Sequence, residues 1–175
     1  INSLAEQDYP PEKFDIIVAD DRSDDGTDKI LENLRIRLKN LKIIHIKTVP
    51  PGISPKKNAI KEAIGISTGE IIAQTDADCV VPVTWLSGLT SHFTKNVGIV
   101  TGIAPYFKRP GMLNSFIRHE YLWNAFLLVS SAVLGCPSHA CARNMAFKRN
   151  IFEINGGYGE KADVISGDDT LLMHS

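Results

Sequence analysis

Three pairs of acidic residues carry most of the chemistry that this sequence can support: Asp20 with Asp21, Asp76 with Asp78, and Asp168 with Asp169. The first two pairs stand at the ends of apolar runs that predict buried strands. Ligands of open α/β sheets bind beyond the carboxyl ends of the strands. We therefore expect these acids to line one crevice, with helix capping as the structural alternative for each of them.

The pair Asp76 and Asp78 is the best candidate for a metal site. The strand before it is apolar, so two charges placed there need a partner. Hard oxygen ligands favour Mg²⁺ or Mn²⁺, which keep open positions for phosphate oxygens. The pair thus predicts a divalent cation that stabilises the charge on a departing diphosphate. An Asp-x-Asp pattern alone has low specificity.

Two lysines, Lys56 and Lys57, precede an expected helix that begins near Asn58. A helix N-terminus combined with ammonium groups favours phosphate binding. The lysines are therefore candidates for binding the diphosphate of a nucleotide, and a solvated loop is the alternative.

The elements that must position these residues alternate between short apolar runs and segments of helical periodicity. This order is typical of βα units and a largely parallel sheet, here in a single domain spanning residues 1–175. Strands are expected at residues 14–20, 41–46, 70–75, 97–103 and 142–147. Helices are expected to bury Ile30, Leu31, Leu34 and Leu38, then Ala59, Ile60, Ala63 and Ile64, then Trp85, Leu86, Leu89 and Phe93.

Four segments resemble, in order, the motifs of the family 2 glycosyltransferases of the GT-A fold. Residues 17–27 (IVADDRSDDGT) are similar to the aspartate-rich nucleotide-binding turn, and residues 56–60, followed by Gly69 and Glu70, to the lysine segment. Residues 75–78 (TDAD) resemble the metal-binding Asp-x-Asp, with Trp85 and Leu86 downstream. Residues 142–147 (ARNMAF) and 166–169 (SGDD) resemble the acceptor-side segment and the acidic pair that carries the base. The resemblance covers nearly the whole chain, and the combination is far more specific than any one motif.

The resemblance implies a Rossmann-like GT-A fold, a mostly parallel sheet flanked by helices. It also implies transfer of a sugar, with inversion, from a nucleotide-diphosphate sugar to the hydroxyl of a glycan or lipid-linked acceptor. UDP is the expected nucleotide, and Mg²⁺ or Mn²⁺ the expected cofactor. The implied nucleotide-binding residues are Asp20, Asp21, Lys56, Lys57 and Asp76.

The remaining roles follow from the same resemblance. Asp78 is the expected direct metal ligand, while Asp76 contacts the ribose or a metal-bound water. The attacking hydroxyl must lose its proton to a carboxylate within hydrogen-bond reach. That base is expected to be Asp169, with Asp168 as its neighbour, and the acceptor side is expected to include Arg143 and Asn144.

The sequence also departs from the family pattern. Ala142 stands where glycine is usual, and Asp168 where glutamate is common. The family's first strand is expected before Ile1, so we expect a truncated domain that is itself inactive. Its two flanking strands would then expose unpaired backbone groups. Either they pair directly with each other or another chain pairs with them, and we favour association between chains.

Charge and composition narrow the possible partners. A net charge of −1 does not suit a nucleic-acid-binding protein, which usually carries a basic excess. The three cysteines show no metal-like spacing and weakly indicate a reducing compartment. A long helix is expected at residues 112–134, beside the acceptor side. Its Phe116, Leu122, Trp123 and Phe126 also suit a membrane interface, so we expect a membrane-associated whole protein on the cytoplasmic face.

Two alternatives come from other functional classes. The stretch Asp76 to Val80 fits the Asp-x-Asp-x-Val pattern of haloacid-dehalogenase-like phosphatases, with Asp76 as nucleophile and Asp78 as acid/base. Two βα units precede it, however, and Leu172 stands where that group needs a third acid. The second alternative is a sugar-nucleotide-binding module without turnover.

Overall fold

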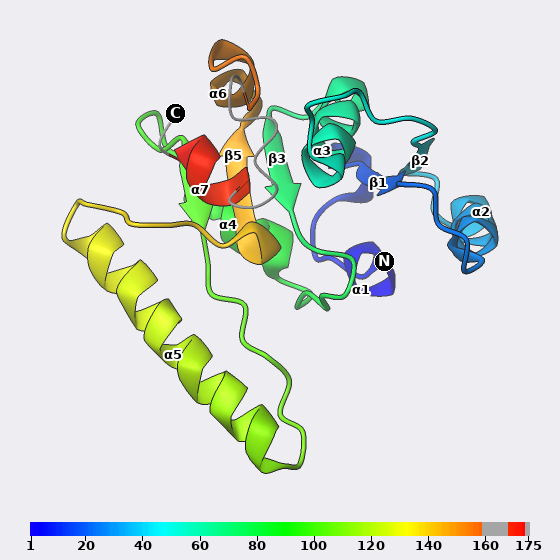
Figure 1. The fold of residues 1–175 in the computed structure, drawn as a ribbon. Coiled ribbons are helices and arrows are strands. Elements are labelled where there is room, and N and C mark those ends of the chain that lie inside the picture. The colour runs from blue at the N-terminus through cyan, green and yellow to red at the C-terminus, as the bar shows by residue number, and fades with distance from the viewer. Residues whose placement is uncertain (159–167, 174–175) are drawn as a thin grey trace.

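The computed structural model describes residues 1–158 and 168–173, apart from a few side chains in the second range. Figure 1 shows two small sheets flanked by helices, with one long helix extending away from the rest. The strands are β1 (Ile16–Asp20), β2 (Leu41–His45), β3 (Ile71–Gln74), β4 (Ile99–Thr101) and β5 (Met145–Lys148). The helices are α1 (Asn2–Ala5), α2 (Thr27–Arg37), α3 (Pro55–Ile66), α4 (Trp85–Ser91), α5 (Met112–Val133), α6 (Arg149–Ile154) and α7 (Asp168–Met173), with 3₁₀ turns η1 (Pro11–Lys13) and η2 (Ala142–Asn144).

The first sheet contains β1 and β2, which run parallel. Their register pairs Ile16 with Leu41 and Asp20 with His45. Parallel neighbours need a crossover connection, and α2 supplies it. The two strands therefore end at the same level, which brings the side chains of Asp20 and His45 together.

The second sheet has the order β3-β5-β4, and β5 runs antiparallel to both neighbours. A largely parallel sheet was expected; β1 and β2 are parallel, but both strand pairings in this second sheet are antiparallel. The strand expected at residues 142–147 begins only at Met145, because the three residues before it form η2.

The edges of β1 and β3 that were expected to lack a neighbour are not paired with each other. Among the described residues, β1 pairs only with β2, and β3 pairs only with β5. The alternative in which these two edges close directly onto each other is therefore wrong. Association between chains through these edges stays a prediction.

The apolar core lies on both faces of β5. Successive side chains of a strand point to opposite faces. Met145 and Phe147 accordingly enter one cluster together with Phe152 and Leu172. Ala146 enters another cluster, with Val81, Trp85 and Leu89. Both faces of β5 are buried because α6 and α7 pack on one face and α4 packs on the other.

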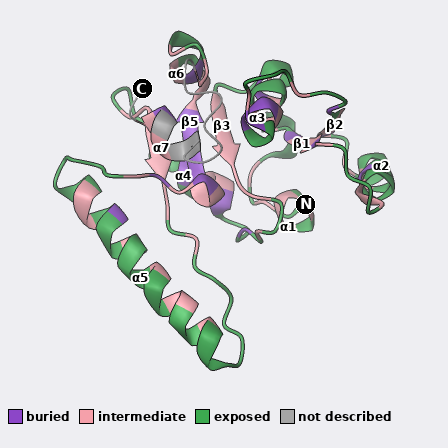
Figure 2. Cartoon of the chain, viewed as in Figure 1, coloured by how far each residue is buried: buried purple, intermediate pink, exposed green. Residues whose placement is uncertain are grey.

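The long helix α5 forms where it was expected, but the four apolar side chains on it that were expected to pack do not. Its apolar side chains remain largely exposed: Phe116 63%, Leu122 63%, Trp123 60% and Phe126 60%. Figure 2 shows exposed residues along most of this helix. Only Leu128 of α5 is fully buried. In the part of the chain that is described, no helix is apolar and long enough to cross a bilayer.

One helix tests how burial determines stability. Ile30 and Leu31 were both expected on the buried face of α2, yet Ile30 is 61% exposed and Leu31 only 1%. We predict that Leu31→Ala lowers the free energy of unfolding by about 2–5 kcal/mol, because it leaves a cavity. Ile30→Ala, the matched control, changes it by less than about 1 kcal/mol. Equal losses in urea denaturation would contradict this packing.

Candidate active site

The carboxylate of Asp20 is buried at the end of β1 and held from two sides. Its Oδ1 accepts a hydrogen bond from the Ser23 N–H at 3.2 Å, and its Oδ2 lies 3.1 Å from His45 Nδ1. Hydrogen bonding by Ser23 is the largest effect that holds the pKa of Asp20 below its ordinary value. Burial opposes this effect, and His45 adds to it. Asp20 is therefore an ionised acceptor in a fixed orientation.

The neighbouring acid, Asp21, lies nearer to solvent. Its carboxylate pairs with the Arg22 guanidinium at 2.8 Å. Arg22 has a φ of 60°, in the left-handed region that non-glycine residues rarely adopt. The chain thus turns sharply just after Asp21, and the carboxylates of Asp20 and Asp21 have different partners.

The Asp76–Asp78 pair follows β3 in a tight turn. The Cys79 N–H donates to the Asp76 carbonyl at 3.1 Å, and the Cys79 thiol donates to Asp78 Oδ1 at 3.7 Å. Asp76 Oδ1 lies 3.3 Å from Lys56 Nζ. One predicted phosphate-binding lysine and one predicted metal-binding acid are thus neighbours in space, although 20 residues apart in the numbering.

The two lysines differ in environment. Helix α3 begins at Pro55 rather than near Asn58, so both lysines lie inside its first turn. Lys56 reaches Asp76, whereas Lys57 is 1% exposed and its Nζ lies 5.2 Å from the centre of the Tyr158 ring. Lys56 is therefore the better candidate for contact with a phosphate.

Helix α3 determines how the strand ends that carry these acids lie relative to each other. At its C-terminal end, Thr68 donates to Asp15, just before β1. Arg149 contacts this end of α3 as well, and its N–H donates to the Glu70 carbonyl before β3. At the N-terminal end of α3, Lys56 reaches Asp76 after β3.

Helix α3 contacts β1 as well, and it therefore runs antiparallel to both strands. Its 12 residues span about 18 Å, close to the roughly 17 Å of a five-residue strand. Asp20 and Asp76 thus lie towards the same end of α3. This direction agrees with the expected shared crevice, whose existence stays a prediction.

Asn144 connects three segments on the expected acceptor side. Its Nδ2 donates to the Ile103 carbonyl at 2.8 Å, and its Oδ1 accepts from Trp85 Nε1 at 2.8 Å. The Gly102 N–H donates to the Asn144 carbonyl, and a Cβ at Gly102 would overlap the Asn144 amide. Because both the oxygen and the nitrogen of its amide are hydrogen-bonded within the protein, the role of Asn144 is to hold η2 in position.

Arg143 lies beside two aromatic rings, those of Tyr106 and Tyr121, which were not predicted from the sequence and which contact each other edge to face. Its guanidinium carbon is 4.8 Å from the centre of the Tyr106 ring and 5.6 Å from that of Tyr121. Tyr121 also accepts a hydrogen bond from the Ala104 N–H. The rings come from the loop after β4 and from α5, so no local pattern around Arg143 predicts them.

The expected base and its neighbour, Asp169 and Asp168, are the first residues of α7. Their side chains lie outside the described part of the structure. Their backbone position at the start of a helix is known, and their catalytic role stays a prediction.

The acids after β3 suit a hard divalent cation. Among the described residues, no three acidic, histidine or cysteine side chains gather closely enough to form a complete metal site. Mg²⁺ is commonly bound by one or two carboxylates, with waters and substrate phosphates completing its shell. The oxygen donors of Asp76 and Asp78 fit such a cation.

A variant of His45 tests the environment of Asp20. We predict that His45→Gln raises the pKa of Asp20 towards its ordinary value, measured by NMR titration of the carboxyl group. Because the folded pKa is lowered, the stability that it contributes is complete above the unfolded value of about 3.9 and is lost as pH falls through the folded value. The variant should lose part of this acid-range stability. Lys42→Gln, which removes the β2 ion pair with Asp15, is the control and should leave the pKa of Asp20 unchanged.

Comparison with known proteins bears on the whole arrangement. The sequence pattern of the family described as Glycosyl transferase family 2 matches residues 1–154. The haloacid-dehalogenase-like alternative is therefore wrong, in agreement with the burial of Leu172 in the core.

Individual relatives cover the chain in different ways. Poly(ribitol-phosphate) beta-N-acetylglucosaminyltransferase TarS of Staphylococcus aureus (strain Mu50) is 39% identical over 79 residues, 45% of this chain and 13% of that protein. Beta-monoglucosyldiacylglycerol synthase of Synechocystis sp. is 30% identical over 93 residues, 53% of this chain and 19% of that protein. The chain thus spans less than a fifth of either relative.

Solved structures match over nearly the entire chain. Mannosyltransferase PcManGT from Pyrobaculum calidifontis, in complex with GDP-Man and Mn²⁺, has a TM-score of 0.71 at 24% identity, over 97% of this chain and 44% of that one. Residues 1–349 of S. aureus TarS, in complex with UDP, have a TM-score of 0.65 at 21% identity, over 98% of this chain and 48% of that one. The chain therefore belongs to glycosyl transferase family 2 and has the GT-A fold.

Proposed function

We propose that the whole protein transfers a sugar, with inversion, from a nucleoside-diphosphate sugar to an acceptor hydroxyl. The observation that carries this proposal is the contact of Lys56 with Asp76. This contact brings the ammonium group of Lys56, the N-terminus of α3 and one acid of the Asp-x-Asp pair close together. PcManGT with GDP-Man and Mn²⁺, and TarS with UDP, support the substrate class. UDP is the nucleotide that we propose.

The acids after β1 take the nucleoside. Asp20 is ionised and fixed by Ser23 and His45, so it is suited to accept hydrogen bonds from a base N–H or a ribose hydroxyl. Asp21 exchanges its Arg22 partner for the nucleoside at modest cost, because that ion pair is exposed to solvent.

The diphosphate lies between the start of α3 and the turn after β3. Asp78 holds Mg²⁺ or Mn²⁺, and Asp76 contacts the ribose or a metal-bound water. When bound, the cation stabilises negative charge on the leaving diphosphate. Lys56 and the positive end of α3 act on the same charge. Lys57, which is buried, supports this turn of the helix rather than the phosphate.

The acceptor hydroxyl attacks the anomeric carbon in a single displacement. Asp169 takes its proton, with Asp168 as neighbour, as the acidic pair of the family motif implies. Arg143 and Asn144 define the acceptor side through η2. A glycan or lipid-linked acceptor, used by a membrane-associated protein on the cytoplasmic face, fits this assignment. The lipid named in beta-monoglucosyldiacylglycerol synthase supports an acceptor of that kind.

The metal assignment is tested by nucleotide binding to the whole protein. We predict that Asp78→Asn weakens binding of UDP in the presence of Mn²⁺ by more than about tenfold in calorimetry, because a metal ligand is lost. Without Mn²⁺ the variant and the native protein should bind equally. Asp8→Asn is the matched control, since Asp8 is exposed and lies outside the nucleotide-binding turn of residues 17–27. A loss that is the same with and without Mn²⁺ would contradict the metal role.

The base assignment is tested by turnover. We predict that Asp169→Asn in the whole protein lowers kcat by about 10²–10⁴-fold, the usual contribution of a general base. The Kd for UDP should stay within about twofold of native, because a proton acceptor acts only during the reaction. Loss of UDP binding together with turnover would show that Asp169 is structural or metal-linked. Native UDP binding without any transfer by the unmodified whole protein would favour a non-catalytic module.

A further inference from the structure

The segment of residues 105–134, named here the α5 surface, exposes an unusual amount of apolar side chain. Its exposed apolar residues include Met112, Leu113, Phe116, Leu122, Trp123 and Phe126. Contiguous exposed apolar surface of this kind on a soluble protein marks a site of interaction. Helix α5 has 22 residues and spans about 33 Å, so the surface is long as well as apolar.

The apolar side chains of the α5 surface follow a helical spacing. Met112, Phe116, Trp123 and Leu127 recur at intervals of four and seven residues and therefore lie along one face. The contacts of α5 with the rest of the molecule are made from other positions, including the buried Leu128 and the partly buried Tyr121. One side of the helix thus holds it to the protein, and the other is left in solvent (Figure 2).

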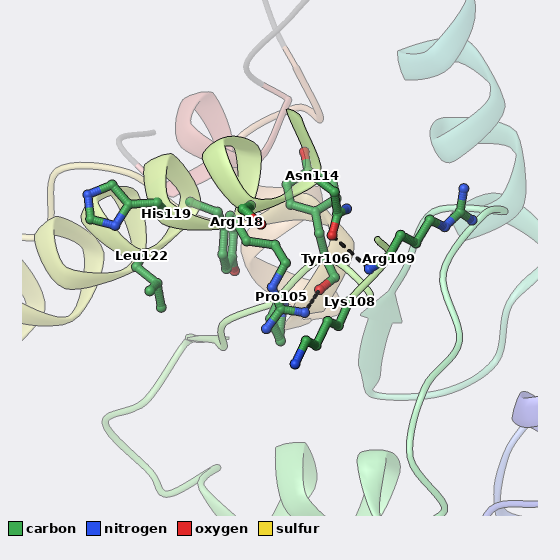
Figure 3. A pocket seen from close by; sticks show the side chains of 10 residues that line it. Pro105, Tyr106, Lys108, Arg109, Asn114, Arg118, His119 and Leu122 are labelled. Atoms are coloured by element: carbon green, nitrogen blue, oxygen red, sulfur yellow. Dashed lines mark hydrogen bonds between the residues drawn. The ribbon is translucent and has the colours of Figure 1, made fainter. Parts of the chain in front are cut away.

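A pocket of about 370 Å³ lies beside this face, between the N-terminal half of α5 and the loop that precedes it. Lys108, Arg109 and Arg118 line it, together with Asn114 and two tyrosines. Arg118 donates to the Tyr106 carbonyl at 3.0 Å, and the Arg109 N–H donates to Asn114 Oδ1 at 2.7 Å. Figure 3 shows these bonds closing the loop onto the helix, with the Lys108 and Arg109 side chains reaching outward.

Charge is separated between the α5 surface and the rest of the chain. Lys108, Arg109 and Arg118 are its basic residues, and Glu120 is its one acid, which leaves a formal charge of +2. The whole chain carries −1, so the remaining residues carry −3. An anionic partner is therefore attracted to the α5 surface and repelled by the rest of the protein.

An anionic lipid bilayer matches both properties at once. Free phosphate would satisfy the cations but leave the apolar face in water. A bilayer buries Phe116 and Trp123 at the boundary of head groups and acyl chains, where aromatic side chains are favoured. Each basic side chain near an anionic leaflet adds electrostatic attraction. Helix α5 does not qualify as a membrane span, so it would lie in the plane of the interface.

We propose that the α5 surface binds the cytoplasmic leaflet of a membrane, with the phosphate of an anionic lipid head group in the pocket of Lys108, Arg109 and Arg118. The apolar face of α5 then enters the acyl boundary. This inference deepens the proposed membrane setting of the transferase and rests on it. It concerns a surface separate from the acids that bind the nucleotide.

Vesicle binding by the 175-residue chain tests the proposal. The chain should float with vesicles of phosphatidylcholine and phosphatidylglycerol, more weakly with phosphatidylcholine alone, and more weakly at raised salt. The double variant Lys108→Gln/Arg109→Gln should lower the partition coefficient on the anionic vesicles about thirtyfold, from about 1 kcal/mol for each charge removed. The double variant Phe116→Ser/Trp123→Ser should lower binding to both kinds of vesicle.

Matched control variants remove charges and apolar side chains of the same kind outside the α5 surface. Lys39→Gln/Lys61→Gln removes two exposed charges, and Ile36→Ser/Ile154→Ser removes two exposed apolar side chains. Both should bind vesicles like the native chain, and circular dichroism should show all variants folded. Absence of vesicle binding would overturn the proposal, as would equal effects of the controls. Saturable binding of inorganic phosphate without vesicle binding, or self-association lost in Phe116→Ser/Trp123→Ser, would identify a different occupant. UDP binding is measured in parallel on the whole protein. Normal UDP binding without vesicle binding would contradict the membrane proposal alone, whereas loss of UDP binding would contradict the transferase assignment.

Discussion

The packing of α3 is the constraint on which the rest of the arrangement depends. The described residues form no backbone ladder between the β1–β2 pair and the β3-β5-β4 sheet. Helix α3 contacts β1, and its Ile64 enters the same apolar cluster as Phe147 of β5. The nucleoside half and the metal half of the proposed site are therefore placed relative to each other by one helix rather than by a continuous sheet.

The direction of α3 is held far from the acids that it serves. Arg149 donates to the Ile64 and Gly69 carbonyls at 3.2 and 2.9 Å, and also to the Ser67 hydroxyl. A guanidinium at this end of a helix satisfies carbonyls that have no partner within the helix, and its charge complements the helix dipole. The opposite end is then left to present Lys56 towards Asp76. A residue after β5 thus controls the geometry at the end of β3.

Prediction from sequence succeeded where a local pattern decides the structure. Short apolar runs between turn residues located the five strands of the described residues, and periodicity located α5 to within one residue at its C-terminal end. It failed where distant contacts decide. The direction of β5 is set by its neighbours in the sheet, and Ile30 is exposed on a side of α2 that the described elements do not bury.

The candidate site divides in the same way. The acids after β1 and β3 were predictable because each stands at the end of an apolar run. The burial of Lys57 and the exposure of Lys56 could not be predicted. Adjacent residues of a helix point about 100° apart, and only the packed structure shows which side is buried. Tyr106 and Tyr121 were missed because they reach Arg143 from other elements.

The contacts of Arg143 connect the acceptor side to the α5 surface. The guanidinium lies against the rings of Tyr106 and Tyr121, and the same two tyrosines line the cationic pocket of that surface. A cation placed over tyrosine rings gains about 0.5–2 kcal/mol, more as water is removed. An ion or head group in the pocket alters the field at these rings, and burial of α5 in a lipid interface removes water around them. The lipid contact proposed for the α5 surface would therefore be coupled to the position of η2 through two side chains, and it would bring the membrane close to the acceptor side of the proposed active site.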